Sequence, residues 1–254
     1  MPAIMNNSSA SLIEVFSSIQ GEGLLIGLRQ IFLRFQSCNL ECIYCDTGRN
    51  VSHEYCAIEG APGRRDFLPV RNPITIDHII KLLEKWQKGW PGIHHSISLT
   101  GGEPLLNVEI LREWLPVLRR YLPVYLETNG TLHATLASLI GHLDHIGMDI
   151  KLPSTSGHPE LWELHEEFLK IAVQKDVFVK IVVGDNTEDW EIIRSCELIS
   201  SISRDVPLIL QPITLENNEI GISPVKSLEF HEIATRFLRE VRIIPQTHKF
   251  LGQL

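Results

Sequence analysis

The stretch IFLRFQSCNLECIYCDT, residues 31–47, joins an apolar run to a group of cysteines. Its first five residues have the Ile, Leu and Phe content of a strand that is buried on both faces of a parallel sheet. Cys38, Cys42 and Cys45 follow this run within a short distance. Because ligands of open α/β and barrel folds bind at the carboxyl ends of strands, the stretch predicts a functional strand end in a parallel α/β fold.

Six further apolar runs follow along the chain, separated by segments of helical character. They are SISLT (96–100), VYLET (124–128), IGMDI (146–150), VFVKIVV (177–183), LILQP (208–212) and VRIIP (241–245). Repeated alternation of strand and helix implies βαβ crossovers. This pattern favours a partial (β/α) barrel with a mostly parallel sheet over a doubly wound sheet or a complete barrel.

Two of the intervening helices have clear start signals. Thr75 has a side chain suited to an N-cap. Apolar residues at helical spacing follow it, namely Ile76, Ile79, Ile80, Leu83 and Trp86. Ser223 followed by Pro224 predicts the start of another helix, which we expect to end near Glu240.

The length of 254 residues allows one sizeable core, and we expect a single domain over residues 1–254. A hydrophobic content of 44% and a charged content of 21% are ordinary for a folded globular protein and exclude a disordered or collagen-like chain. Residues 48–74 lack clear periodicity and carry glycines, prolines and charges. They predict an inserted loop beside the cysteines.

The charge and the cysteine content limit the classes of partner and compartment. A net charge of -8 argues against a nucleic-acid partner and favours a small molecule. The first residues lack the features of a signal peptide, and no run of about 18 apolar residues occurs, so we expect no membrane association. An odd number of cysteines fits a reducing compartment, and we expect a cytoplasmic location.

The spacing of the three cysteines points to a metal centre. With five cysteines in the chain, this spacing has a chance expectation of about 0.002. A structural zinc site needs four protein ligands, and His53 or Cys56 is a candidate for the fourth. A four-iron cluster held by three thiolates instead leaves one iron open to a substrate or cofactor, and we favour this interpretation.

The motifs resemble those of a known family. The Cys-x3-Cys-x2-Cys spacing together with GGEP at 101–104 resembles the radical S-adenosylmethionine (SAM) superfamily. Six motifs, IQGEG (19–23), CNLECIYCDT (38–47), LTGGEP (99–104), LETNGT (126–131), LQP (210–212) and QTHKFLG (246–252), are together similar to the 7-carboxy-7-deazaguanine synthase family of queuosine and deazapurine biosynthesis. They span nearly the whole chain.

The resemblance implies a set of cofactor residues. Cys38, Cys42 and Cys45 would hold a 4Fe-4S cluster whose open iron binds SAM. The residues implied for SAM are Tyr44, Asp46, Gly101, Gly102, Glu103, Asp149, Lys151 and Gln211. In this picture the glycines let the backbone approach the amino acid part of SAM, and Glu103 accepts from its ammonium group. The chain has Asp149 and Ser37 where the family often has serine and glycine.

The resemblance also implies a substrate, a metal ion and a reaction. The substrate would be 6-carboxy-5,6,7,8-tetrahydropterin, and the implied contacts are Ile19, Gln20, Gly21, Glu22, Arg34, Thr100, His248 and Leu254. Thr47 would bind Mg2+, and we expect the C-terminus to fold over the pterin. Hydrogen abstraction at C6, ring contraction and loss of ammonia would make the enzyme a lyase. A flavodoxin- or ferredoxin-type electron donor and a homodimer are further implications.

Two alternatives share parts of this pattern. Another radical SAM enzyme, such as a glycyl-radical activase, would have the cysteines without QGEG, ETNGT and QTHK. A non-catalytic metal-binding module would share the cysteines alone. Cys56 and Cys196 match no motif and are expected to be free thiols.

Overall fold

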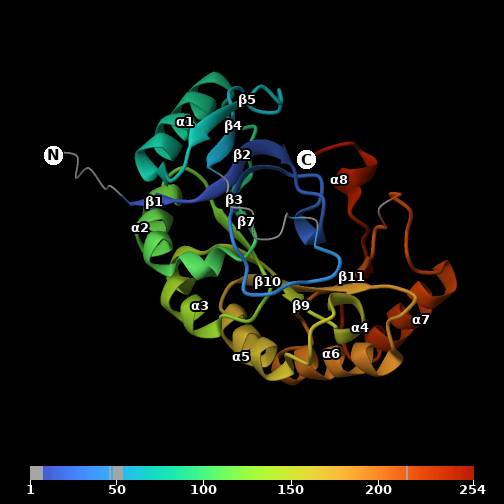
Figure 1. Ribbon diagram of the computed structural model, residues 1–254. Coiled ribbons are helices and arrows are strands. Elements are labelled where there is room, and N and C mark those ends of the chain that lie inside the picture. The colour runs from blue at the N-terminus through green and yellow to red at the C-terminus, as the bar shows by residue number, and fades with distance from the viewer. Residues whose placement is uncertain (1–7, 46, 48–53, 216) are drawn as a thin grey trace.

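The computed structural model describes residues 8–45, 47, 54–215 and 217–254. Ten strands form one curved sheet in the order β12-β11-β10-β9-β8-β7-β3-β2-β4-β5, with helices along its outer side (Figure 1). These strands are β2 (Leu12–Ile19), β3 (Arg29–Phe35), β4 (Tyr55–Glu59), β5 (Phe67–Arg71), β7 (Ser96–Gly101), β8 (Val124–Thr128), β9 (His145–Ile150), β10 (Asp176–Val183), β11 (Leu208–Pro212) and β12 (Val241–Ile243). β1 (Ser9–Ala10) and β6 (Ile74–Thr75) form a separate antiparallel pair.

The sheet is parallel from β3 through β12, and its remaining pairs are mixed. Strands β3, β7, β8, β9, β10, β11 and β12 are paired in parallel in that order. β2 is antiparallel to β3 and parallel to β4, and β4 is antiparallel to β5. All seven apolar runs form strands, so the predicted α/β class with a mostly parallel sheet is confirmed.

The helices cover the outer side of the sheet with apolar faces. They are α1 (Ile76–Gly89), α2 (Val108–Leu118), α3 (His133–Leu139), α4 (Pro153–Ser156), α5 (Trp162–Ala172), α6 (Asp189–Ile202), α7 (Pro224–Thr235) and α8 (Thr247–Phe250). Trp86 of α1, Trp114 of α2 and Phe168 of α5 are completely buried. Burial of a large apolar side chain stabilises the fold by ~1.5–3 kcal/mol. None of the described helices is long and apolar enough to span a membrane.

Both predicted helix starts are found, and one predicted helix end is wrong. Thr75 caps α1 by accepting from the backbone N–H of His78 at 3.3 Å. Ser223 caps α7 in the same way, but α7 ends at Thr235 and not near Glu240. The chain leaves the helix because the backbone N–H of Arg239 bonds to Arg204, and the carbonyl of Glu240 accepts from Leu208 at the start of β11.

The predicted inserted loop at residues 48–74 is wrong for its described part. Residues 54–74 contain the β4–β5 hairpin, which extends the sheet beyond β2. Cys56 and Ile58 of β4 are buried, and their alternation with more exposed neighbours makes β4 a half-buried strand. Pro69 and the charged residues of the hairpin hide this pattern in the sequence. Cys56 lies in β4 and Cys196 lies in α6, and both are buried free thiols.

Candidate active site

A large pocket lies where the parallel strands end. The space of about 1160 Å3 between its lining residues includes solvent at the open mouth. Thirteen of the predicted site residues line it: Glu22, Arg34, Cys38, Cys42, Tyr44, Cys45, Thr47, Thr100, Gly101, Gly102, Asp149, Lys151 and Gln211. The structure therefore brings the predicted cofactor and substrate residues into one cavity. Asp46 lies outside the described residues.

Six predicted residues do not line this pocket. They are Ile19, Gln20, Gly21, Glu103, His248 and Leu254. Gln20 and Glu103 are buried behind the pocket wall, whereas Leu254 is exposed. Gln20 and Glu103 hold neighbouring residues of the site through hydrogen bonds.

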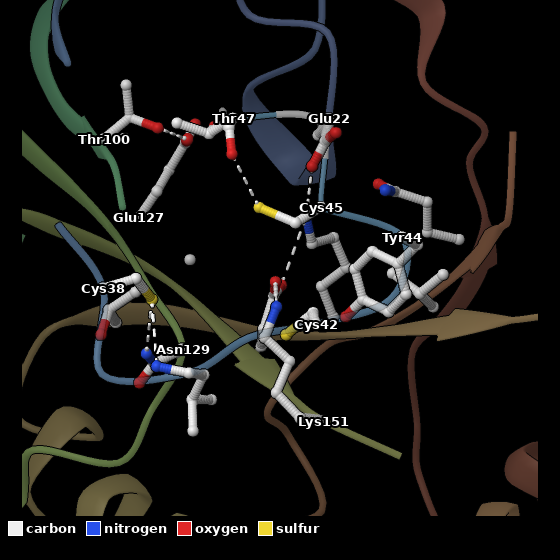
Figure 2. A pocket seen from close by; sticks show the side chains of 18 of the residues that line it. Glu22, Cys38, Cys42, Tyr44, Cys45, Thr47, Thr100, Glu127, Asn129 and Lys151 are labelled. Atoms are coloured by element: carbon white, nitrogen blue, oxygen red, sulfur yellow. Dashed lines mark hydrogen bonds and ion pairs between the residues drawn. The ribbon is translucent and has the colours of Figure 1, made fainter. Parts of the chain in front are cut away.

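The three cysteines lie on the loop that follows β3. Their side chains turn into the same pocket (Figure 2). Two backbone hydrogen bonds hold the loop. The N–H of Cys45 donates to the carbonyl of Cys42 at 3.2 Å, and the N–H of Ile43 donates to the carbonyl of Ser156 at 3.0 Å. Burial raises the pKa of the Cys38 and Cys42 thiols.

The donor set fits an iron-sulfur cluster. Three soft thiol ligands on one short loop face one cavity, and thiolates are the ligands that such clusters take. Among the described residues no three His, Cys, Asp or Glu side chains surround a single point as one metal ion requires. The Cys38, Cys42 and Cys45 side chains would hold the cluster.

The two glycines at the end of β7, Gly101 and Gly102, fit the cysteine loop closely. A side chain on Gly102 would place its Cβ 1.8 Å from the carbonyl oxygen of Ser37, and one on Gly101 would lie 2.3 Å from that of Phe35. Gly102 donates its N–H to Phe35 at 3.1 Å, and Glu103 donates its N–H to Ser37 at 2.8 Å. The glycines are thus required by the crossing of two backbones.

Ser37 stands where the family often has glycine, and its backbone conformation accounts for that glycine. Its φ is 67°, a left-handed conformation that glycine adopts without steric cost and other residues adopt rarely. The chain therefore keeps the backbone shape of a glycine at this position with a serine.

Glu103 ties the ends of β7 and β8 together. Its carboxylate is completely buried. It accepts from the hydroxyl of Thr128 at 3.0 Å and from the backbone N–H groups of Asn129 at 2.8 Å and Leu105 at 3.0 Å. These bonds give Glu103 a structural role, and its contact with the SAM ammonium group stays a prediction. Glu103 supports the turn on which the pocket is built.

The titration of Glu103 gives a pH-dependent stability. Burial raises the pKa of its carboxyl to about 7, against the lowering effect of its hydrogen bonds. Between about pH 4.5 and 7 the folded state then holds more protons than the unfolded state, so stability falls as the pH rises through this window. From pH 5 to 8 we expect the free energy of unfolding to fall by roughly 2–4 kcal/mol more in the wild type than in Glu103→Gln.

Urea unfolding followed by tryptophan fluorescence at several pH values measures this difference. The comparison of slopes removes the contributions of the other titrating groups, which both proteins share. Parallel pH profiles for the two proteins would show that Glu103 ionises normally in the folded state.

A chain of buried charges crosses the pocket from β2 to β9. Lys180 of β10 pairs with Glu22 and lies 3.3 Å from Asp149 Oδ1, and Lys151 Nζ lies 2.5 Å from Asp149 Oδ2. Burial opposes ionisation of Glu22, but Lys180, Gln246 and His248 together outweigh it and lower the pKa of this carboxyl to about 2. The pKa of Lys180 and that of Lys151 are raised by their carboxylate neighbours, chiefly Asp149, despite burial. These groups therefore stay charged at neutral pH.

Tyr44 stands beside the cation of Lys151. The Lys151 Nζ atom is 5.4 Å from the centre of the Tyr44 ring, within the range of a cation–π contact. Burial raises the pKa of Tyr44 to about 12, so its hydroxyl keeps its proton at neutral pH. Both residues line the pocket near the cysteines (Figure 2).

Glu127 is a pocket residue that the list of predicted sites missed. It lies next to the last residue of β8, in the LETNGT motif, and accepts from Thr100 Oγ1 at 2.5 Å and from Gln20 Nε2 at 2.6 Å. Burial and the charge of Glu22 raise its pKa. Gln20 and Thr100 thus hold Glu127, and the motif itself was the signal that could have identified it.

Lys180 and Gln246 were also missed. Lys180 stands in the middle of VFVKIVV, where a single cation in an apolar strand is a signal for a buried ionic partner. Gln246 belongs to the QTHKFLG motif and donates to Glu22 at 2.7 Å. Both side chains line the pocket.

Two of the predicted ligand contacts have polar groups turned to the cavity. Arg34 lines the pocket and uses Nε to bind Glu14 at 2.7 Å. Gln211 is 3% exposed, and its Oε1 has no hydrogen-bond partner among the described residues. A buried amide oxygen of this kind is satisfied when a ligand donates to it.

The C-terminal segment returns to the β2 side of the sheet (Figure 1). Thr247 donates its backbone N–H to the carbonyl of Gly21 at 2.9 Å. His248 packs on Gly21 so closely that a Cβ there would lie 2.1 Å from its ring. Arg65, from the turn of the β4–β5 hairpin, donates to the carbonyl of Gly252. We name residues 246–252 the C-terminal strap.

Comparisons with known proteins identify the family of this chain. The profile of the Radical SAM superfamily matches residues 33–199. The 7-carboxy-7-deazaguanine synthase of Geobacter sulfurreducens is 60% identical over 250 residues, which cover 98% of this chain and 100% of that protein. The protein of the same name from Archaeoglobus fulgidus is 31% identical, with coverage of 96% and 98%.

A solved structure shares the fold. The crystal structure of QueE from Escherichia coli matches with a TM-score of 0.58 and 19% identity, covering 92% of each chain. The superfamily profile spans the cysteine loop and the strands β7, β8, β9 and β10, which contribute residues to the pocket. On these findings the chain belongs to the 7-carboxy-7-deazaguanine synthase family within the radical SAM superfamily.

Proposed function

We propose that this protein converts 6-carboxy-5,6,7,8-tetrahydropterin into 7-carboxy-7-deazaguanine with loss of ammonia, as a carbon–nitrogen lyase of queuosine biosynthesis. The observation that carries the proposal is one pocket with three thiols and, on the same walls, the charges of Glu22, Arg34 and Lys180. The full-length identity of 60% to the Geobacter sulfurreducens synthase supports it.

The cysteine side of the pocket suits the cofactors. As a radical SAM protein the chain uses a 4Fe-4S cluster, which when bound supplies the electron for reductive cleavage of SAM. We assign Cys38, Cys42 and Cys45 to the cluster. Lys151 and Tyr44 border the SAM position, and the unpartnered Oε1 of Gln211 is the acceptor offered to it.

The β2 side of the pocket suits a carboxypterin. Glu22 stays ionised because Lys180 and two further neighbours lower its pKa to about 2, so it can accept paired N–H donors from an aminopyrimidine edge. Arg34 uses one of its five donors on Glu14 and has a fork suited to a carboxylate. Thr47 offers a single hydroxyl to Mg2+, which keeps most of its water shell. We expect the conversion of the carboxypterin by this protein to depend on Mg2+.

Anaerobic reconstitution followed by a turnover assay tests the proposal. The protein is loaded with iron and sulfide, reduced, and given SAM and the carboxypterin with and without Mg2+. We expect a brown protein, formation of 7-carboxy-7-deazaguanine and a lower rate without Mg2+. SAM cleavage without conversion of the pterin would favour another radical SAM enzyme, such as a glycyl-radical activase, and a colourless zinc protein would favour a metal-binding module.

The C-terminal strap gives a prediction for substrate binding. Arg65→Ala removes the side-chain bond to Gly252 and loosens the strap beside Gly21 and Glu22. We expect KM for the carboxypterin to rise about 2- to 10-fold with kcat little changed, as for loss of one net hydrogen bond. Steady-state kinetics measure this.

Arg64→Ala is the matched control, because Arg64 is an exposed neighbour in the same turn. It should behave as the wild type does. An unchanged KM in Arg65→Ala would mean that the strap is held without this contact.

The proposal extends to the partners of the protein. The reductant is a small electron-transfer protein of flavodoxin or ferredoxin type, and the protein acts as a homodimer. We also propose that residues 1–254 form a single domain. Five free cysteines suit a reducing compartment, so the proposed location is the cytoplasm. Gel filtration with light scattering measures the oligomeric state.

A further inference from the structure

Asn129 lies in the turn after β8 with its backbone fixed on both sides. Its N–H donates to the buried carboxylate of Glu103 at 2.8 Å. Its carbonyl lies 3.2 Å from Nε2 of His165, a completely buried residue of α5. Because a carbonyl only accepts, the imidazole donates from Nε2. The turn is therefore tied to β7 and to α5 at this one residue.

The side-chain amide of Asn129 has one defined orientation. Its Oδ1 accepts from the N–H of Thr131 at 3.1 Å and from the Thr131 hydroxyl at 2.6 Å. Its Nδ2 donates to Asn39 Oδ1 at 2.8 Å and points to Cys38 Sγ at 3.7 Å. A flipped amide would turn its N–H2 group toward the N–H of Thr131, so the network assigns the nitrogen to the sulfur side.

Asn39 joins this network from the cysteine loop itself. It follows Cys38 in the sequence and donates from Nδ2 to Thr131 Oγ1 at 2.9 Å. We name Asn39, Asn129 and Thr131 the amide latch, since it closes the cysteine loop onto the end of β8. Asn129 is only 6% exposed, so its donors face little competition from water. Figure 2 shows Asn129 directed at the Cys38 sulfur.

We infer that Asn129 is a positioning residue that sets the reduction potential of the iron-sulfur cluster through its hydrogen bond to Cys38. Reduction adds negative charge to the cluster and its sulfur ligands, and an N–H donor stabilises that charge and raises the potential. The inference rests on the proposed ligation of the cluster by Cys38. It assigns to the Asn of the ETNG motif a role in making the cluster reducible.

A redox titration of two variants, followed by electron paramagnetic resonance, tests the inference. Asn129→Asp keeps the shape of the side chain and replaces the donor with an acceptor, and Asn129→Ala removes the side chain. We expect both midpoints to be more negative. For Asn129→Asp the ratio of reduced to oxidised cluster at a fixed potential should fall about tenfold, which is 59 mV for a one-electron couple.

Thr131→Val is the matched control in the same motif. It removes the hydroxyl that donates to Asn129 Oδ1 and accepts from Asn39 Nδ2. The Thr131 N–H still holds Asn129 Oδ1, and the Asn129 Nδ2 group still faces Cys38. Its midpoint should stay close to that of the wild type. A shift in Thr131→Val as large as that in Asn129→Asp would mean that general disturbance of the turn, and not the N–H donor, moves the potential.

A second measurement needs no folded variant. Wild-type protein is labelled with asparagine carrying 15N only in its side-chain amide, and the reduced cluster is studied by pulsed electron paramagnetic resonance. A 15N coupling is expected, because Asn129 is the described asparagine whose amide nitrogen contacts a cysteine sulfur. The inference would be overturned if the wild type showed no 15N coupling, or if the iron-replete variants had the same midpoint potential as the wild type. Failure of the wild type to bind four irons or cleave SAM would instead overturn the proposed function.

Discussion

Gly102→Ala is expected to lose most of the bound iron and to lower kcat about 100-fold or more, because the cysteine loop must move. The added Cβ would lie 1.8 Å from the carbonyl oxygen of Ser37 and 3.1 Å from the backbone nitrogen of Cys38. Both contacts are with backbone, so no side-chain rotation relieves them. Overpacking of this kind destabilises a protein by roughly 1–3 kcal/mol.

Iron and sulfide content after anaerobic reconstitution, together with turnover, measure the effect. Gly141→Ala is the control, since a Cβ at Gly141 meets nothing within 4 Å. It should bind iron and turn over as the wild type does. A fully loaded, active Gly102→Ala protein would show that the loop tolerates displacement from the end of β7.

Lys180→Met is expected to destabilise the protein by roughly 3–5 kcal/mol, because it leaves the largely buried carboxylate of Glu22 without its cation, whereas Asp149 keeps Lys151. The partners of Lys180 are Glu22 on the substrate side and Asp149 on the SAM side, and all three side chains are less than a quarter exposed. Without Lys180, burial raises the pKa of Glu22. A neutral Glu22 no longer accepts two N–H donors, so we expect kcat/KM for the carboxypterin to fall at least about 100-fold.

Urea unfolding and steady-state kinetics separate the two effects of Lys180→Met. Lys170→Met is the matched control, because Lys170 also pairs with two carboxylates, Glu166 and Glu167, but on an exposed face of α5. Exposed pairs of this kind contribute little, and the control should match the wild type in both measurements. Wild-type kinetics in Lys180→Met would remove Lys180 from the substrate site.

The parallel part of the sheet could be predicted from the sequence, and its antiparallel flank could not. Continuous apolar runs mark strands that are buried on both faces, and all seven such runs were identified. β2, with the sequence LIEVFSSI, and the β4–β5 hairpin lack that composition. β5 in particular is largely exposed at the edge of the sheet, with Leu68 62% exposed and Pro69 in its middle. An edge strand of this kind has little apolar signal.

Many pocket residues could be predicted because residue type and motif agree, but the hydrogen-bond network behind the pocket wall could not. The cysteines, Lys151 and Gln211 all reach the predicted pocket. The motif predicts Glu103 as a site residue, but it does not predict the bonds that its carboxylate accepts from Thr128, Leu105 and Asn129. Such pairings join strands distant in the sequence, and no local pattern encodes them.

The ionic partners of Lys180 could not be predicted from the sequence either. Within VFVKIVV it gives no sign of which carboxylates it faces, since Glu22 is 158 residues away. Its place is fixed by the order of strands in the sheet, which brings β10 opposite the turn after β2. The residues that carry charge across the pocket are therefore visible only after the topology is known.

The C-terminal strap has a consequence for the order in which a ribosome completes the site. The residues around the proposed cluster have all been synthesised once residue 180 is reached. They are the cysteine loop, Gly101, Gly102, the amide latch and Lys180. Gln246 and Thr247, which contact Glu22 and Gly21, follow every described strand of the sheet in the chain. During synthesis, the residues proposed to bind the cluster are therefore complete well before the strap that contacts the pterin side of the pocket.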